Sequence, residues 1–125
     1  MPAARSIAIL VVDDQQTMRG MARQVLKQLG VIDVSLAASA EAALETMAAK
    51  KFDVVISDLN MPGMSGVELA QKIKAHPVLK TVPVFLATSE AYRDQADDAI
   101  DHLVAKPFVV QDLKTALEAK LGAIT

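Results

Sequence analysis

The stretch Ile7-Ala-Ile-Leu-Val-Val12 is continuously apolar and is followed directly by two acids, Asp13 and Asp14. Most of its residues are β-branched, and apolar and polar side chains do not alternate along it. This pattern is typical of a strand buried on both faces, as in a parallel sheet that helices cover on each side. The stretch therefore predicts an α/β fold rather than a sheet with one face in water.

Four further runs predict four more strands, at 34–37, 52–57, 82–87 and, more weakly, 103–105. Between them, apolar residues recur every three or four positions, as on one face of a helix. The expected helices begin near Met18, at Ser39, at Ser65 and before Leu113. Gly30 and His76-Pro77 mark the expected ends of the first and third helices, the second is expected to run through Lys50, and the last is expected to close at Gly122.

Alternation of such strands with helices implies right-handed crossovers and a parallel sheet with helices on both faces. We therefore expect an α/β domain with a (βα)5 doubly wound, five-stranded parallel sheet. The chain of 125 residues has the size of one domain, and we expect residues 1–125 to form it. The helix expected at 90–101 is the least clearly marked, because nearly all of its apolar residues are Ala.

The composition excludes several kinds of function. Thirteen Lys+Arg against 15 Asp+Glu give a net charge of -2, so the chain lacks the basic surface of a nucleic-acid-binding protein. Without cysteine there are no disulfides, thiolate metal sites or cysteine nucleophiles. The apolar run at 7–12 is too short for a signal peptide or a membrane span. We expect a cytoplasmic protein that binds neither nucleic acid nor membrane.

Polar residues follow four of the five expected strands. Asp13 and Asp14 end the first strand, Asp58 the third, Thr88 the fourth and Lys106 the fifth. In an open parallel sheet, ligands bind at the carboxyl ends of the strands. Each residue alone is explained by a helix cap, a turn or a solvated side chain. Together on one edge of the sheet, they predict a functional site.

The residue types at this edge favour phosphoryl chemistry. Three carboxylates repel one another unless a cation lies among them, and oxygen ligands without His or Cys suit Mg²⁺. Asp58 is the candidate acceptor, because carboxylates form aspartyl phosphates where positive charge neutralises the incoming group. Lys106 provides a second cation, and the Thr88 hydroxyl is placed to contact the phosphoryl oxygens.

Four motifs resemble the receiver domains of bacterial two-component response regulators, and in particular the single-domain, CheY-like type. They are Val12-Asp13-Asp14, Ile56-Ser57-Asp58-Leu-Asn-Met-Pro-Gly63, Ala87-Thr88-Ser89 and Ala105-Lys106-Pro107-Phe108. The resemblance covers nearly the whole chain. It implies the flavodoxin-like strand order 2-1-3-4-5 and a single receiver domain without an effector domain.

The resemblance also implies a role for each site residue. Asp58 is the phosphoacceptor, and Mg²⁺ is held by Asp14, Asp58 and the main-chain carbonyl of Asn60, with Asp13 acting mainly through coordinated water. Thr88 and Lys106 contact the phosphoryl group. The peptide that follows Lys106 is expected to be cis, as bonds before proline permit.

The sequence departs from the family pattern in one region. The interval between Thr88 and Lys106 is shorter than usual by about one helical turn. Leu103 stands where the family has an aromatic switch residue, and Tyr92 is a candidate substitute.

The resemblance also concerns the lifetime of the signal. Glu90, with Asn60, matches the pattern associated with quick self-dephosphorylation.

The implied function is a phosphorylation-activated signalling switch that promotes only its own phosphorylation and dephosphorylation. The expected donor is a sensor histidine kinase or a histidine phosphotransfer protein, and the output is binding to a downstream protein target. Chemotaxis, a phosphate relay and general stress signalling remain open as the pathway. We expect a monomer, and dimerisation on phosphorylation is left open.

Two other classes of protein fit less well. A haloacid-dehalogenase-type phosphatase also uses an Asp nucleophile and Mg²⁺, but proteins of that class carry an Asp-x-Asp pattern after the first strand. Here Gln15 occupies the second position, and the sequence shows no cap domain. A flavodoxin-like FMN carrier needs a phosphate loop rich in Ser, Thr and Gly, whereas Asp13 and Asp14 would repel an unpaired phosphate.

Overall fold

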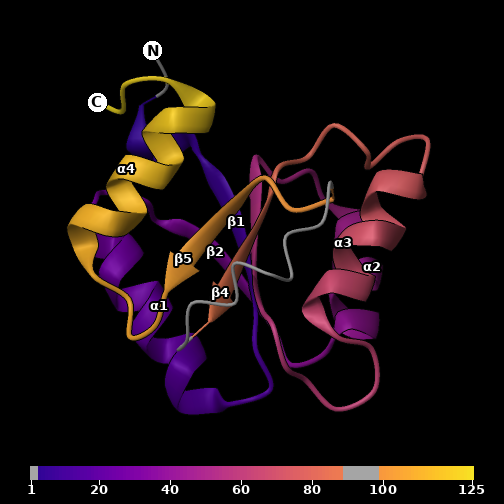
Figure 1. Cartoon of the computed structure of the whole chain (residues 1–125). Helices are drawn as coiled ribbons and strands as arrows, with labels where there is room; N and C mark the ends of the chain where they lie inside the picture. Colours follow the sequence, from indigo (N-terminus) through magenta and orange to yellow (C-terminus); the bar gives the residue numbers. More distant parts are fainter. Residues whose placement is uncertain (1–2, 89–98) are drawn as a thin grey trace.

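The computed structural model describes residues 3–88 and 99–125, which form a five-stranded parallel sheet between two layers of helices (Figure 1). The strands are β1 (Ala8–Val12), β2 (Asp33–Ala37), β3 (Val54–Asp58), β4 (Val84–Thr88) and β5 (His102–Ala105). The helices are the short 3-10 helix η1 (Ala4–Ser6), α1 (Gln16–Gln28), α2 (Ala40–Ala49), α3 (Gly66–Ala75) and α4 (Val110–Leu121).

The strand order is β2-β1-β3-β4-β5, and every pair is parallel, which confirms the predicted fold class. The chain runs from β1 outward to β2 and then returns to the other side of β1 to form β3. The direction of winding therefore reverses between β1 and β3. In such sheets the ligand site lies beyond the carboxyl ends of the strands at this point of reversal.

The helices cover the two faces of the sheet in pairs, with α1 and α4 on one face and α2 and α3 on the other (Figure 1). The strand β1 is buried along its whole length, as its continuous apolar sequence predicted. Ile9 and Val11 pack into the core beneath α1 and α4, whereas Leu10 and Val12 pack beneath α2 and α3. Both cores are mainly aliphatic, and they hold the strand ends in fixed positions.

The helix ends agree with the sequence signals. Ser39 caps α2, and Ser65 forms a capping box with Glu68 at the start of α3. Gly30 and Gly122 follow α1 and α4 with φ of 91° and 84°, a backbone conformation that glycine adopts without strain.

Three strands begin later than the sequence pattern indicated. The predicted strands at 52–57 and 82–87 begin in the structure at Val54 and Val84. Pro83 has no N–H to donate to the ladder, which explains the second difference. The strand β1 begins at Ala8 rather than Ile7.

The structure describes four of the five expected α-helices. Most of the helix expected at 90–101 lies outside the described residues, as do Glu90 and Tyr92. Leu103 lies in β5, opposite Leu86 of β4, and is partly buried. Within residues 3–88 and 99–125, no helix is both long and apolar enough to cross a membrane.

Asp101 links three elements near the amino ends of β4 and β5. Its Oδ2 accepts hydrogen bonds from Lys74 Nζ of α3 at 2.8 Å and from the main-chain N–H of Val84 at 2.7 Å. On its other oxygen, Lys120 Nζ of α4 lies 3.3 Å from Oδ1. Burial raises the pKa of the Asp101 carboxyl, but the hydrogen bonds from Lys74, Val84 and Lys120 together outweigh burial and hold this pKa below its ordinary value.

Asp101→Asn is expected to lower the free energy of unfolding at pH 7 by about 1–2 kcal/mol, because a neutral amide pairs less strongly with two ammonium groups. Since folding lowers the pKa of Asp101, its carboxylate stabilises the fold above pH 3.8. This contribution is lost as the pH falls below that value and through the folded pKa. Urea denaturation of both proteins at about pH 7 and about pH 3, which lie above and below the ordinary carboxyl pKa, measures the change.

The matched control is Asp33→Asn, because the pair between Asp33 and Lys50 is far more exposed. Its expected effect at pH 7 is at most about 0.5 kcal/mol. A difference between wild type and Asp101→Asn that stays constant with pH would contradict the assigned role of the carboxylate.

Candidate functional site

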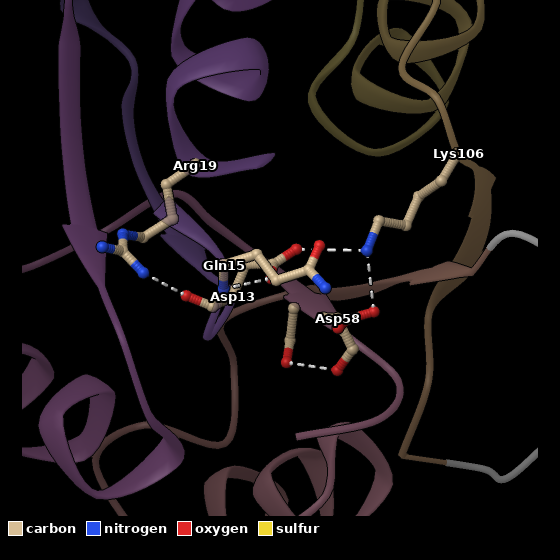
Figure 2. A network of polar contacts seen from close by, with 6 residues as sticks. Asp13, Gln15, Arg19, Asp58 and Lys106 are labelled. Carbon is tan, nitrogen blue, oxygen red and sulfur yellow. Dashed lines mark hydrogen bonds and ion pairs between the residues drawn. The ribbon is translucent and has the colours of Figure 1, made fainter. Parts of the chain in front are cut away.

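Asp13, Asp58 and Lys106, three of the residues predicted at the ends of the strands, converge at the carboxyl edge of the sheet (Figure 2). Asp13 directly follows β1, Asp58 is the last residue of β3, and Lys106 directly follows β5. Lys106 Nζ lies 3.1 Å from Asp13 Oδ2 and 3.0 Å from Asp58 Oδ1. One ammonium group therefore bridges two carboxylates that are far apart in the sequence.

A third carboxylate completes the cluster. Asp13, Asp14 and Asp58 each offer an oxygen, and these oxygens all lie within 4.8 Å of one another. Asp13 is buried, Asp58 is partly buried and Asp14 is exposed. Among the residues that the structure describes, Lys106 is the cation in contact with these carboxylates, so the cluster keeps a net negative charge that a divalent cation would offset. An all-oxygen donor set of this kind fits Mg²⁺.

The clustering of these charges changes the pKa of Asp58 and of Lys106. Burial raises the pKa of the Asp58 carboxyl, and the negative charge of Asp13 raises it further. The hydrogen bond from Lys106 lowers this pKa but does not bring it back to its ordinary value. Burial also acts to lower the pKa of Lys106, but its hydrogen bonds to Asp58 and Asp13 outweigh this and raise the pKa. Lys106 is thus a permanent cation at neutral pH, and the cluster favours further positive charge.

Hydrogen bonds fix the loop between β1 and α1 around Asp13 (Figure 2). Its main-chain N–H donates to the carbonyl of Ala37 at 3.1 Å, and its Oδ1 accepts the N–H of Gln15 at 2.9 Å. Arg19 Nη1 of α1 donates to the carbonyl oxygen of Asp13 at 2.8 Å. Sequence reasoning missed Arg19, because no residue pattern shows that its side chain turns back to the carbonyl of Asp13.

The loop after Asp58 is fixed by close packing with α3. The N–H of Gly66, the first residue of α3, donates to the carbonyl of Leu59 at 2.9 Å. A Cβ atom at Gly66 would lie 2.2 Å from the carbonyl oxygen of Asp58. Only glycine permits this approach, and sequence reasoning recognised the adjacent cap but not this requirement.

An open pocket of about 470 Å³ gives access to the cluster. It is lined by Asp14, Gln15, Met18, Asp58, Asn60, Lys106 and Pro107. The pocket thus brings together four of the predicted site residues. The peptide between Lys106 and Pro107 is cis, as the resemblance implied.

Thr88 differs from the other predicted residues, because it is buried and does not line this pocket. It is the last residue of β4, and its carbonyl accepts the N–H of Lys106 at 2.9 Å. The strand β4 lies between β3 and β5 in the sheet. Asp58 of β3 pairs with Ala87, the residue before Thr88, and Thr88 itself pairs with Ala105 of β5. Its position at the carboxyl edge agrees with the prediction.

The chain is similar in sequence to one protein family model and to several known proteins. Residues 9–118 match the family model described as the response regulator receiver domain. The chemotaxis protein CheY of Pseudomonas aeruginosa is 39% identical over 114 residues, which cover 88% of this chain and 92% of that protein. The chemotaxis protein CheY-3 of Vibrio cholerae is 36% identical over 118 residues, which cover 91% of each.

Solved structures show the same similarity. The chemotaxis response regulator CheY4 of Vibrio cholerae has a TM-score of 0.81 at 29% identity and covers 92% of this chain and 98% of its own. The response regulator TrrA of Thermotoga maritima, solved in complex with Mg²⁺ and BeF, has a TM-score of 0.82 at 32% identity. That match covers 92% of this chain and 99% of the other.

Proposed function

The chain belongs to the response regulator receiver domain family, and we propose that Asp58 is the residue on which it is phosphorylated. The protein is a phosphorylation-activated signalling switch. The observation that supports Asp58 as acceptor is the ion cluster in which Lys106 joins Asp58 to Asp13 beside Asp14. Asp58 is the carboxylate that both contacts Lys106 and lines the open pocket.

The metal site proposed here consists of Asp14, Asp58 and the main-chain carbonyl of Asn60, with Asp13 acting through a coordinated water. Bound Mg²⁺ would neutralise charge on the phosphoryl group during transfer. In this arrangement Asp14 and Asp58 supply the anionic ligands.

The protein's own groups carry the transfer step. A carboxylate oxygen of Asp58 forms a bond to phosphorus while the bond from phosphorus to the donor breaks, and its electron pair leaves with the donor. Lys106, which remains protonated, offsets the charge that arrives beside Asp58. We assign to the Thr88 hydroxyl a hydrogen bond with the phosphoryl group, which forms only in the phosphorylated state and biases the protein toward its active form.

The proposed donor is a sensor histidine kinase or a histidine phosphotransfer protein, and the proposed output is a protein target in chemotaxis. The chemotaxis relatives support this pathway. Affinity capture with and without beryllofluoride and Mg²⁺, which mimic the phosphorylated state, identifies the target. A motility protein retained in only one condition would support chemotaxis, and a target in another pathway would contradict it.

Acetyl phosphate tests the acceptor assignment directly. Wild-type protein incubated with acetyl phosphate and Mg²⁺ is expected to gain one phosphoryl group per chain, and peptide mass spectrometry should place it on Asp58. Chelation of Mg²⁺ with EDTA should prevent the modification, because the carboxylates then repel the incoming anion. A phosphoryl group on another residue, or labelling that does not depend on Mg²⁺, would refute the assignment.

A further inference from the structure

Arg19 lies one helical turn beyond the site and contacts it only through the main chain. Its side chain extends from α1 to the carbonyl oxygen of Asp13, and Lys106 approaches Asp13 from the other side (Figure 2). Arg19 is not among the residues that line the pocket. Its direct contact with the site is therefore the hydrogen bond to Asp13.

The carbonyl of Asp13 belongs to the peptide bond that joins it to Asp14. That peptide unit is planar, so a hydrogen bond that fixes its oxygen also fixes the N–H and the Cα of Asp14. The side chain of Asp14 is exposed, and none of the residues that the structure describes holds it by a hydrogen bond or an ion pair. The main chain therefore sets the position of the Asp14 Cβ atom, and with it the region that the carboxylate can reach.

We propose that Arg19 is a positioning residue for the Mg²⁺ site, because its hydrogen bond to Asp13 orients the peptide that carries Asp14. This inference rests on the proposed function, in which Asp14 is a direct ligand of the metal. Hydrogen bonds that orient metal ligands commonly change metal affinity by about 10-fold to 100-fold. Arg19 belongs to this class of residue, although its bond is made to the main chain of the ligand loop.

The charge of Arg19 makes the inference sharply testable. A guanidinium close to a cation site repels the cation, so the loss of its charge alone would strengthen Mg²⁺ binding. The loss of its hydrogen bond frees the Asp13–Asp14 peptide and would weaken binding. The two effects have opposite signs, so the direction of the change identifies the role of Arg19.

The experiment measures Mg²⁺ affinity of the full chain by isothermal titration calorimetry. Arg19→Met, which keeps the length of the side chain but has no donor, is expected to raise the dissociation constant about tenfold. Arg19→Lys, which keeps the charge and one flexible donor, is expected to recover part of the affinity. Arg23→Met is the matched control: it removes the same charge one turn later in α1, beside Lys27 and Ile32, and its dissociation constant should stay within about twofold of wild type.

The outcomes separate this inference from the proposed function. If wild type binds Mg²⁺ and Arg19→Met binds it equally or more tightly, Arg19 is not a positioning residue, and the site itself stands. If wild type does not bind Mg²⁺, the proposed function fails. Should Arg19→Met not fold, as judged by urea denaturation without Mg²⁺, Arg19→Ala takes its place, because it also has no donor. Wild-type Mg²⁺ affinity in the folded Arg19→Ala variant would likewise overturn the inference.

Discussion

Asp58→Asn is expected to reduce labelling by acetyl phosphate from one phosphoryl group per chain to background. The side-chain amide of asparagine is not a nucleophile toward phosphorus, and the other carboxylates of the cluster do not share the position of Asp58 between Lys106 and the pocket. Intact-protein mass spectrometry after incubation with acetyl phosphate and Mg²⁺ gives the result directly. Labelling of the variant at the wild-type level would remove Asp58 from the mechanism.

The variant should fold, so that loss of labelling reports on chemistry. Burial and the charge of Asp13 raise the pKa of Asp58, which means that its ionised form is less favourable in the folded protein than in the unfolded chain. At pH 7 the ionised carboxylate therefore lowers stability, and replacing it with a neutral amide is expected to raise the free energy of unfolding. Urea denaturation of both proteins checks the sign.

A matched control for labelling is Asp112→Asn. Asp112 lies in the first turn of α4 and is exposed, away from the residues that line the pocket. This variant loses one carboxylate, as Asp58→Asn does, and should be labelled like wild type. Reduced labelling of Asp112→Asn would show that acetyl phosphate labelling responds to total charge rather than to the acceptor.

The sequence predicted the strands and the edge at which the candidate site lies, because each buried strand and the polar residue that follows it are adjacent along the chain. Continuous apolar runs such as that at 7–12 identify doubly buried strands, and the residue after each run necessarily lies at the carboxyl edge. The pairing of Asp13 and Asp58 with Lys106 follows from this placement. The strand order did not follow from the pattern, since right-handed crossovers leave open on which side of β1 the next strand lies.

Other features depend on distances that no pattern shows. Arg19 reads as one more charged residue on the outer face of a helix, and its bond to Asp13 depends on how the chain turns from β1 into α1. Gly66 reads as the residue after a helix cap, and its contact with Asp58 depends on how closely α3 approaches β3. At 90–101 the Ala-rich sequence gives little contrast between a buried and an exposed face.

Gly66→Ala is the second substitution for which we expect a large effect, and it acts through packing. The added Cβ would lie 2.2 Å from the carbonyl oxygen of Asp58 and 2.6 Å from Leu86 Cδ1. The first of these contacts is with main chain, so α3 has to move away from the end of β3. We expect the free energy of unfolding to fall by about 3 kcal/mol, at the upper end of the usual cost of overpacking.

The same displacement should also reach the phosphorylation site, because the atom that Gly66 would strike belongs to Asp58. Labelling by acetyl phosphate is therefore expected to slow, even under conditions in which Gly66→Ala remains folded. Gly20→Ala is the matched control: Gly20 is exposed within α1, and an added Cβ meets no atom within 4 Å. That substitution should raise the free energy of unfolding by about 0.5–1 kcal/mol through helix propensity and leave labelling unchanged. Equal stability of the two variants would show that α3 does not depend on close contact with the end of β3, and that the position of Asp58 is set by the strand alone.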